Sequence, residues 1–134
     1  SDLIMSGVLP RFPDLQFVSV ESGIGWVPFV LEAADHSYLN NRGRDGNEWD
    51  LLPSEYFARQ VYATYWFETV APTKLLGAIP VDRILFETDF PHPTCLYGNV
   101  HEKIATSLGG ATDEQRQRIL WQNAADLYHA EPPP

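Results

Sequence analysis

Three short apolar runs alternate along the chain with segments of helical character. The runs are LQFVSVE at 15–21, QVYATY at 60–65 and ILFET at 84–88. In the first and last runs, apolar residues occupy both alternating sets of positions. This pattern is typical of strands that are buried on both faces, as in a parallel sheet. We therefore predict three parallel strands.

The segments around these strands carry helix signals. Pro28 suits the first turn of a helix, Ser54 is a candidate N-cap, and Gly77 is a candidate helix-ending glycine. The polar, glycine-rich stretch 40–50 predicts a loop. The predicted helices cover 3–9, 28–38, 54–59, 73–76 and 101–108.

The C-terminal region has a specific helix-start signal. Thr112 stands three residues before Gln115, which is the spacing of a capping box. This spacing predicts a helix from Thr112 to about Gln122, and Asn123 is then a candidate cap for a final turn. Strands alternating with helices indicate the α/β class, with parallel strands and flanking helices. Because no repeat or linker is visible, we expect one domain over 1–134.

Composition narrows the classes of partner. Hydrophobic residues make up 44% of the 134 positions and the net charge is −9, with no run of Lys or Arg. A packed globular protein is expected, and neither nucleic acid nor an anionic membrane is an expected partner. No signal peptide or membrane-spanning run is visible. The single cysteine, Cys95, forms no internal disulfide and favours a reducing, cytoplasmic compartment.

The richest candidate chemistry follows the third apolar run, in Phe86-Glu87-Thr88-Asp89-Phe90-Pro91-His92. Functional groups of parallel α/β proteins gather at the C-terminal ends of strands. Asp89 stands there and could bind a divalent metal, move a proton, or do both. The same position also suits an aspartate that caps the following turn, and the local pattern favours that alternative. His92 would support a metal ligand or serve the structure of the loop.

A second acid follows the first strand. Glu21 precedes Ser22-Gly23-Ile24-Gly25, and we predict that its carboxylate lies on the same side of the sheet as Asp89. The glycines resemble a dinucleotide-binding loop only in part, because Pro28 stands where the third glycine belongs. A nicotinamide cofactor is therefore not expected. The aromatic residues of 56–67 could line a pocket, although core packing is the favoured use.

Five segments together resemble the amidohydrolase-related family of metal-dependent hydrolases and decarboxylases. They are LPRFPDL at 9–15, VESGIGWVPF at 20–29, PSEYFARQVYATYWFE at 53–68, ILFETDFPHP at 84–93 and NAADLY at 123–128. The resemblance implies a partial (β/α)8 barrel, in which this chain supplies about the last three β/α units. It implies that Asp89 binds the metal and handles protons, and that His92 matches the histidine after it. Glu21 falls where many members have a histidine, so it would contact substrate or support the metal site.

The family's metal is implied to be zinc or manganese, and its substrate a small carboxylic acid that is aromatic in many members. Hydrolysis and decarboxylation remain open. The family's paired ligands on the first strand and its histidine on the fifth have no counterpart in this chain. Because a full barrel needs roughly 250 residues, we expect a C-terminal portion that is inactive alone. The alternative is a non-catalytic, self-associating half-barrel.

The strand pattern also carries an expectation about assembly. Three parallel strands leave two unpaired edges, and strand edges recruit other strands. Phe17, Val61 and Phe86, or their strand neighbours, would face water in a monomer. We therefore predict a homodimer or higher oligomer, with the two-fold dimer as the simplest closed form.

Overall fold

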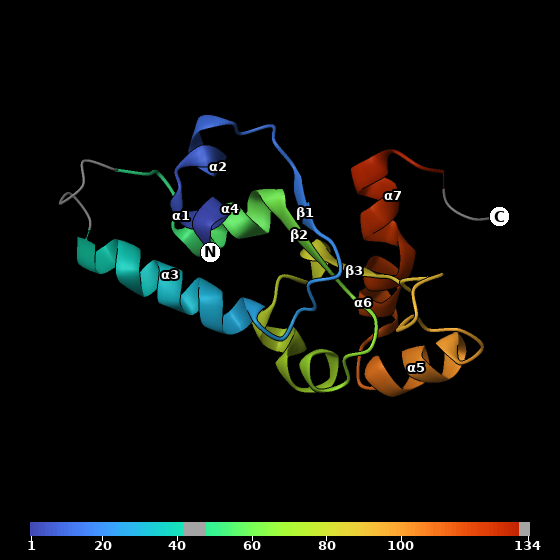
Figure 1. The fold of residues 1–134 in the computed structure, drawn as a ribbon. Helices are drawn as coiled ribbons and strands as arrows, with labels where there is room; N and C mark the ends of the chain where they lie inside the picture. Colours follow the sequence, from blue (N-terminus) through green and yellow to red (C-terminus); the bar gives the residue numbers. More distant parts are fainter. Residues whose placement is uncertain (42–47, 132–134) are drawn as a thin grey trace.

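The computed structural model describes residues 1–41 and 48–131 of the chain, and it has the predicted α/β architecture. In Figure 1 the three strands lie between α3 and α4 on one side and α5, α6 and α7 on the other. The strands are β1 (Phe17–Ser19), β2 (Val61–Tyr65) and β3 (Ile84–Phe86). The longer helices are α3 (Val27–Asn41), α4 (Pro53–Gln60), α5 (Val100–Ser107), α6 (Asp113–Gln117) and α7 (Asn123–Tyr128).

Short helical turns fill the connections between these elements. Two of them, α1 (Asp2–Met5) and α2 (Val8–Arg11), replace the single N-terminal helix that was predicted, because Gly7 takes a left-handed φ of 74° between them. Two others are short π-helices, η1 (Ala71–Leu75) and η4 (Arg118–Gln122). The remaining two are short 3-10 helices, η2 (Leu76–Ala78) and η3 (Val81–Arg83).

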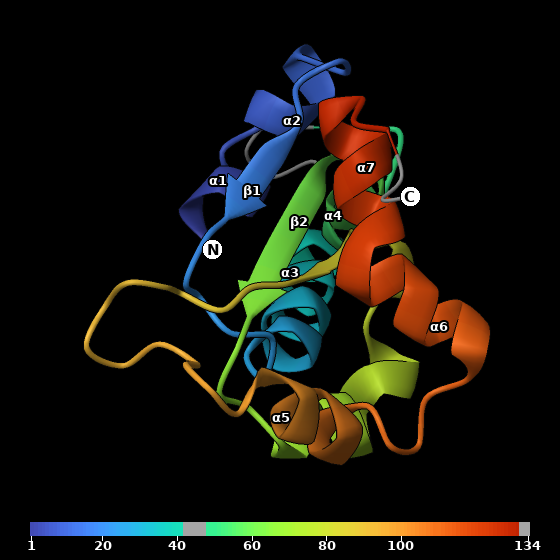
Figure 2. The same cartoon turned by 90° about the vertical axis from the view of Figure 1, so that its right-hand side faces the viewer.

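The sheet is parallel, with β2 in the middle. Val18 pairs with Tyr62, and Thr64 pairs with Leu85. The prediction of three parallel strands is confirmed, although β1 and β3 are shorter than the apolar runs that indicated them. In Figure 2, α3 and α4 lie behind β2. On the other side, η4 and α7 pack against β3. All three strands therefore end toward the same edge, where their loops meet.

The core lies between the sheet and the helices, and several aromatic residues contribute to it. Phe57, Tyr65 and Ile84 are fully buried, and Ile119 brings η4 against the sheet. The favoured use of the 56–67 aromatics is confirmed for Tyr56, Tyr62, Tyr65 and Trp66, but Phe67 is exposed. The expectation that Val61 faces water is wrong, because its side chain is only 2% exposed and belongs to this core. Phe17 on the free edge of β1 is 41% exposed.

Four local expectations about helix ends are wrong. Ser54 does not cap α4; Leu52 precedes the helix, and its N–H donates to the Glu55 carboxylate at 2.7 Å. Gly77 lies within a 3-10 turn instead of ending an α-helix. The predicted loop 40–50 begins too early, since α3 runs to Asn41, and 42–47 lie outside the described residues. Asn123 continues a helix, with φ −61° and ψ −38°, instead of capping one.

The capping box of α6 is confirmed. Gln115 N–H donates to Thr112 Oγ1 at 3.2 Å, and Thr112 N–H donates to Gln115 Oε1 at 3.0 Å. No helix in the described part of the chain is long and apolar enough to cross a membrane.

The replacement Thr112→Ala is expected to lower the free energy of unfolding by about 1 kcal/mol, because Gln115 N–H then loses its acceptor. Urea unfolding measures this change. Thr112→Ser, which keeps the hydroxyl, is the matched control and should retain most of the stability. Equal losses in both variants would show that the methyl group matters and that the cap does not.

Candidate functional site

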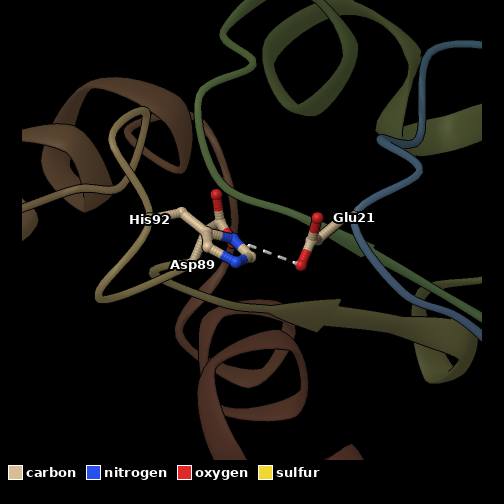
Figure 3. A group of neighbouring side chains, drawn as sticks. All are labelled: Glu21, Asp89 and His92. Carbon is tan, nitrogen blue, oxygen red and sulfur yellow. Dashed lines mark hydrogen bonds and ion pairs between the residues drawn. The ribbon is translucent and has the colours of Figure 1, made fainter.

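Three chemically reactive side chains meet at the C-terminal edge of the sheet. Glu21 follows β1, whereas Asp89 and His92 lie in the segment that follows β3. One ligand atom from each side chain lies within 4.8 Å of the others. In Figure 3 the Glu21 carboxylate faces the His92 ring across the gap between the two segments. The prediction that Glu21 and Asp89 lie on the same side of the sheet is confirmed.

Asp89 is the buried member of the group. Its side chain is 4% exposed, whereas that of His92 is 59% exposed. His92 Nδ1 lies 2.5 Å from Asp89 Oδ1, and Thr94 Oγ1 donates to Asp89 Oδ2 at 3.3 Å. Both carboxylate oxygens are thus directed at side chains. The main-chain oxygen of Asp89, not its side chain, closes the turn by accepting His92 N–H at 2.9 Å.

Glu21 completes the group from the opposite segment. Its Oε1 lies 3.6 Å from His92 Nδ1, and its side chain is 47% exposed. Glu21 and Asp89 also share an uncommon backbone conformation, with φ of 54° and 58°. Residues other than glycine adopt positive φ at some cost in energy, and such strained positions collect at functional sites. The surrounding structure therefore holds Glu21 and Asp89 in a backbone conformation that residues with a side chain rarely adopt.

The electrostatics of the group act mainly on His92. The hydrogen bond to Asp89 raises the pKa of His92 above its ordinary value, and the negative charges of Asp89 and then Glu21 raise this pKa further. The protonated ring is thus favoured between the two carboxylates. Because the pKa is raised in the folded state, the stabilisation is present below the ordinary histidine pKa. It is lost as pH rises through the folded value.

The variant Asp89→Asn is expected to lower the pKa of His92, because it removes the two largest causes of the upward shift. Glu21→Gln should lower the pKa by less, since Glu21 contributes the third cause. Proton NMR of the His92 ring across a pH titration, in the presence of a chelator, measures both changes. A larger change in the Glu21 variant would contradict this order.

Three residues that sequence reasoning did not single out also shape the site. Thr64 Oγ1 and Glu87 Oε1 both accept the main-chain N–H of Glu21, at 2.8 Å and 3.1 Å. Glu68 accepts Ile24 N–H at 2.7 Å and Gly25 N–H at 2.9 Å. A side chain at Gly23 would place its Cβ 3.0 Å from the Glu68 carboxylate, which would have to shift, and the φ of 67° at Gly23 also favours glycine. The glycine-containing turn that resembled part of a dinucleotide-binding loop therefore binds the Glu68 carboxylate of the same chain.

The segment after β3 closes over the strand ends. Figure 2 shows it crossing the C-terminal end of β2. Trp66 Nε1 donates to Thr94 O at 3.3 Å, and Leu96 N–H donates back to Thr88 O at 2.8 Å. Burial raises the pKa of Tyr65 to about 12, so its hydroxyl stays protonated near neutral pH.

Comparison with known proteins identifies the class to which this fold belongs. The family model described as amidohydrolase matches residues 1–130, so the chain belongs to the amidohydrolase family. The chain is 30% identical over 132 residues to Decarboxylase orsB of Emericella nidulans. That alignment covers 93% of this chain but only 38% of the relative.

Solved structures show the same fold. The 5-carboxyvanillate decarboxylase LigW from Sphingomonas paucimobilis superimposes with a TM-score of 0.77 at 24% identity, over 95% of this chain and 37% of that chain. A dihydroxybenzoic acid decarboxylase from Polaromonas sp. JS666, with bound manganese and the inhibitor 2-nitroresorcinol, gives a TM-score of 0.74 at 23% identity. It covers 98% of this chain and 39% of that chain. The match to a little over a third of each neighbour agrees with a partial barrel.

The donor atoms of the site are compatible with a divalent metal. Glu21 and Asp89 offer carboxylate oxygens and His92 offers an imidazole nitrogen, all within 4.8 Å of one another. Carboxylate and imidazole ligands suit manganese and zinc. Since ligands must be deprotonated, metal binding to His92 Nδ1 would displace a proton from this nitrogen. The His92–Asp89 hydrogen bond would be broken in that event.

Proposed function

We propose that this chain supplies the C-terminal β/α units of a metal-dependent decarboxylase that acts on a small aromatic carboxylic acid. The observation that carries the proposal is the buried Asp89 carboxylate at the strand ends, hydrogen-bonded to the exposed His92 and faced by Glu21. The similarity to a curated decarboxylase and to the folds of two others favours decarboxylation over hydrolysis. The chain spans 38% of the length of its curated relative, so this activity is proposed for the whole protein.

Asp89 is the proposed metal ligand of this chain, and Glu21 and His92 are placed to support it. Manganese is the metal of the Polaromonas structure, and zinc suits the same donors. A divalent cation bound here would supply a Lewis acid for the oxygens of the substrate. With two carboxylates and one imidazole, the chain offers a net negative site that attracts such a cation.

The proposed proton transfer uses the Asp89–His92 pair. In the proposed step, a proton passes from His92 Nδ1 through Asp89 Oδ1 to the ring carbon that bears the carboxylate group. The bond between that carbon and the carboxylate then breaks, its electron pair returns to the ring, and carbon dioxide leaves. His92, with Nδ1 2.5 Å from Asp89 Oδ1 and its ring open to solvent, then regains its proton from water. Burial of Asp89 keeps this proton from exchanging directly with water.

The isolated chain is proposed to be inactive. A catalytic metal usually has about three protein ligands, whereas Asp89 is the one metal ligand proposed for this chain, and its Oδ1 is hydrogen-bonded to His92 Nδ1. The test compares the 134-residue chain with the complete protein that carries it. Both are assayed for release of carbon dioxide from dihydroxybenzoates and 5-carboxyvanillate, with MnCl2, with ZnCl2 and with a chelator. Metal-dependent release by the complete protein alone supports the proposal, and hydrolysis of ester or amide substrates without decarboxylation would overturn it.

We further propose that the isolated chain associates with itself in the cytoplasm. In the described residues β1 and β3 each pair on one side only, and the exposed side chains near the β1 edge include Phe17 and Val20. Exposed strand edges and apolar patches favour pairing with a second copy. The single cysteine supports a reducing compartment.

Sedimentation at micromolar concentration is expected to give a dimer or larger species. Phe17→Lys, which places a charge on the free β1 edge, is expected to shift the chain toward monomer. The control is Phe29→Lys, which changes an exposed aromatic on α3 and not on a strand. A monomer that unfolds cooperatively would contradict the proposal.

A further inference from the structure

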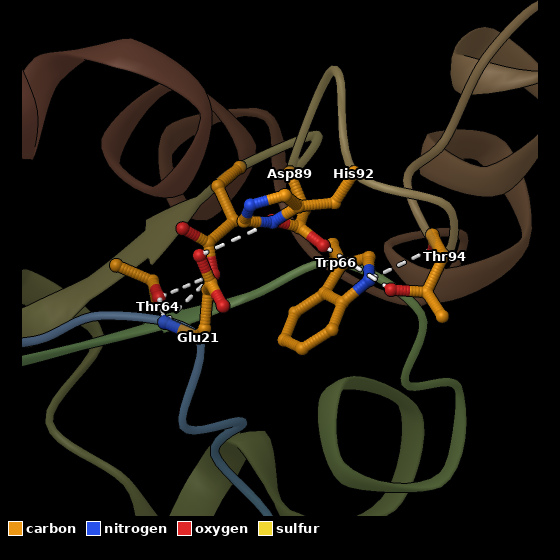
Figure 4. A network of polar contacts seen from close by, with 7 residues as sticks. Glu21, Thr64, Trp66, Asp89, His92 and Thr94 are labelled. Atoms are coloured by element: carbon orange, nitrogen blue, oxygen red, sulfur yellow. Dashed lines mark hydrogen bonds and ion pairs between the residues drawn. The ribbon is translucent and has the colours of Figure 1, made fainter.

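The main chain of Glu21 is held by one side chain from β2 and one from the segment that follows β3. Its N–H donates to Thr64 Oγ1 at 2.8 Å and to Glu87 Oε1 at 3.1 Å. Thr64 belongs to β2, and Glu87 follows the end of β3. Figure 4 shows the Thr64 hydroxyl beside the Glu21 nitrogen. A single N–H on one segment thus joins three parallel elements at the edge of the sheet.

These contacts have a defined direction. The Thr64 hydroxyl donates to Glu87 Oε1 at 2.5 Å, so its oxygen lone pairs remain available to accept Glu21 N–H. Thr64 is buried and Glu87 is half-buried. A hydrogen bond to a carboxylate in such surroundings is stronger than one between neutral groups. The carboxylate of Glu87 therefore fixes the rotation of Thr64, and Thr64 in turn fixes the Glu21 nitrogen.

The backbone of Glu21 needs this restraint. Its φ of 54° lies in the left-handed region, which residues with a side chain rarely adopt. Such a conformation persists only where the surroundings over-determine it. The φ angle also sets the direction in which the Glu21 side chain leaves the backbone. Fixing the nitrogen therefore directs the Glu21 side chain toward His92, whose Nδ1 lies 3.6 Å from Glu21 Oε1.

We propose that Thr64 and Glu87 are positioning residues that set the distance between the Glu21 carboxylate and the Asp89–His92 pair. Glu87 lies two residues before Asp89 in the same segment, so its contact with Glu21 links the two acids directly. The relevance of this spacing to catalysis rests on the proposed function. The spacing itself is a property of the chain and can be measured without metal or turnover.

The rest of the loop is held independently, which makes the proposal testable. Glu68 accepts the N–H groups of Ile24 and Gly25, in the turn that precedes α3. Loss of the Thr64 hydroxyl or of the Glu87 carboxylate should therefore free Glu21 without unfolding the loop. Thr64→Val and Glu87→Met remove the acceptors with little change in size. Thr64→Ser and Glu87→Gln keep an acceptor oxygen and serve as matched controls.

The experiment is NMR of the labelled 134-residue chain and its four variants in the presence of a chelator. Two quantities are measured, the hydrogen-exchange rate of the Glu21 amide and the nuclear Overhauser effect between Glu21 side-chain protons and the His92 ring. In Thr64→Val and Glu87→Met the Glu21 amide should exchange roughly two- to tenfold faster, the change expected from losing one ordinary hydrogen bond. The contact with His92 should weaken in both, and both controls should restore it.

An unchanged Glu21 amide and an unchanged contact with His92 in both disruptive variants would overturn the proposal. Loss of the contact in the two controls as well would also overturn it, since a general loosening of the sheet would then be the cause. If one variant fails to fold, the other pair decides between these results. A negative result would leave the proposed decarboxylase intact, because neither readout depends on metal or substrate.

Discussion

Replacing Asn123 with alanine is expected to lower the free energy of unfolding by about 2 to 4 kcal/mol. Asn123 is 2% exposed, and its Nδ2 donates to Val81 O at 2.8 Å and to Ile84 O at 2.9 Å. The alanine variant leaves two main-chain oxygens at the start of β3 without these donors. A buried polar group without a partner costs about 1 to 3 kcal/mol. Urea unfolding followed by circular dichroism measures the loss.

Asn41→Ala is the matched control for this prediction. The Asn41 amide also donates to a main-chain oxygen, Ser37 O at 2.9 Å, but the residue is exposed at the end of α3. Water replaces the lost donor there, so the change should stay within about 0.5 kcal/mol. Similar losses in the two variants would show that burial of the β3 oxygens does not set the cost.

Asn123 also illustrates what local patterns miss. Its position after a predicted helix suggested a cap, but its backbone is helical and its side chain reaches residues about 40 positions earlier in the chain. Sequence spacing records contacts within one or two turns, such as the Thr112–Gln115 capping box, which was confirmed. Contacts between distant segments leave no such pattern. The strands were predictable because their apolar pattern extends over every residue of a run, although only β2 is buried throughout and Phe17 of β1 is exposed.

The same distinction applies to the candidate site. The nearness of Glu21 and Asp89 was predictable, because both acids follow strands of one parallel sheet and parallel strands end at a common edge. The roles of Thr64 and Glu87 were not, since each occupies a strand or strand-end position with no local signal of its own. Glu68 also had no local signal in the sequence, although Gly23 and Gly25, which lie against its carboxylate, were noted as a glycine pattern. Residues that hold a site together are therefore harder to predict than residues that stand at its centre.

The largest functional effect is expected for Asp89→Asn in the complete protein that carries this chain. Loss of a positioned proton-transfer group typically lowers the rate by about 10² to 10⁴-fold. Asparagine keeps the size of the side chain, but its amide can neither carry the proton to the substrate nor receive one from His92 Nδ1. The lost Asp89–His92 hydrogen bond also removes the main cause of the raised His92 pKa, so fewer His92 rings are protonated near neutral pH. Turnover of a dihydroxybenzoate with saturating MnCl2 measures kcat.

Metal content, measured on the same samples, separates the two proposed roles of Asp89. Manganese lost together with activity would identify the carboxylate as a metal ligand. Manganese retained with low activity would identify it as the proton carrier. Asp82→Asn is the control, because Asp82 is a surface acid whose side chain is 70% exposed and whose partner, Arg118, lies 3.5 Å away on η4. If Asp89→Asn kept kcat within about tenfold of the parent, below the range for a lost proton-transfer group, the proposed centre of the site would be wrong.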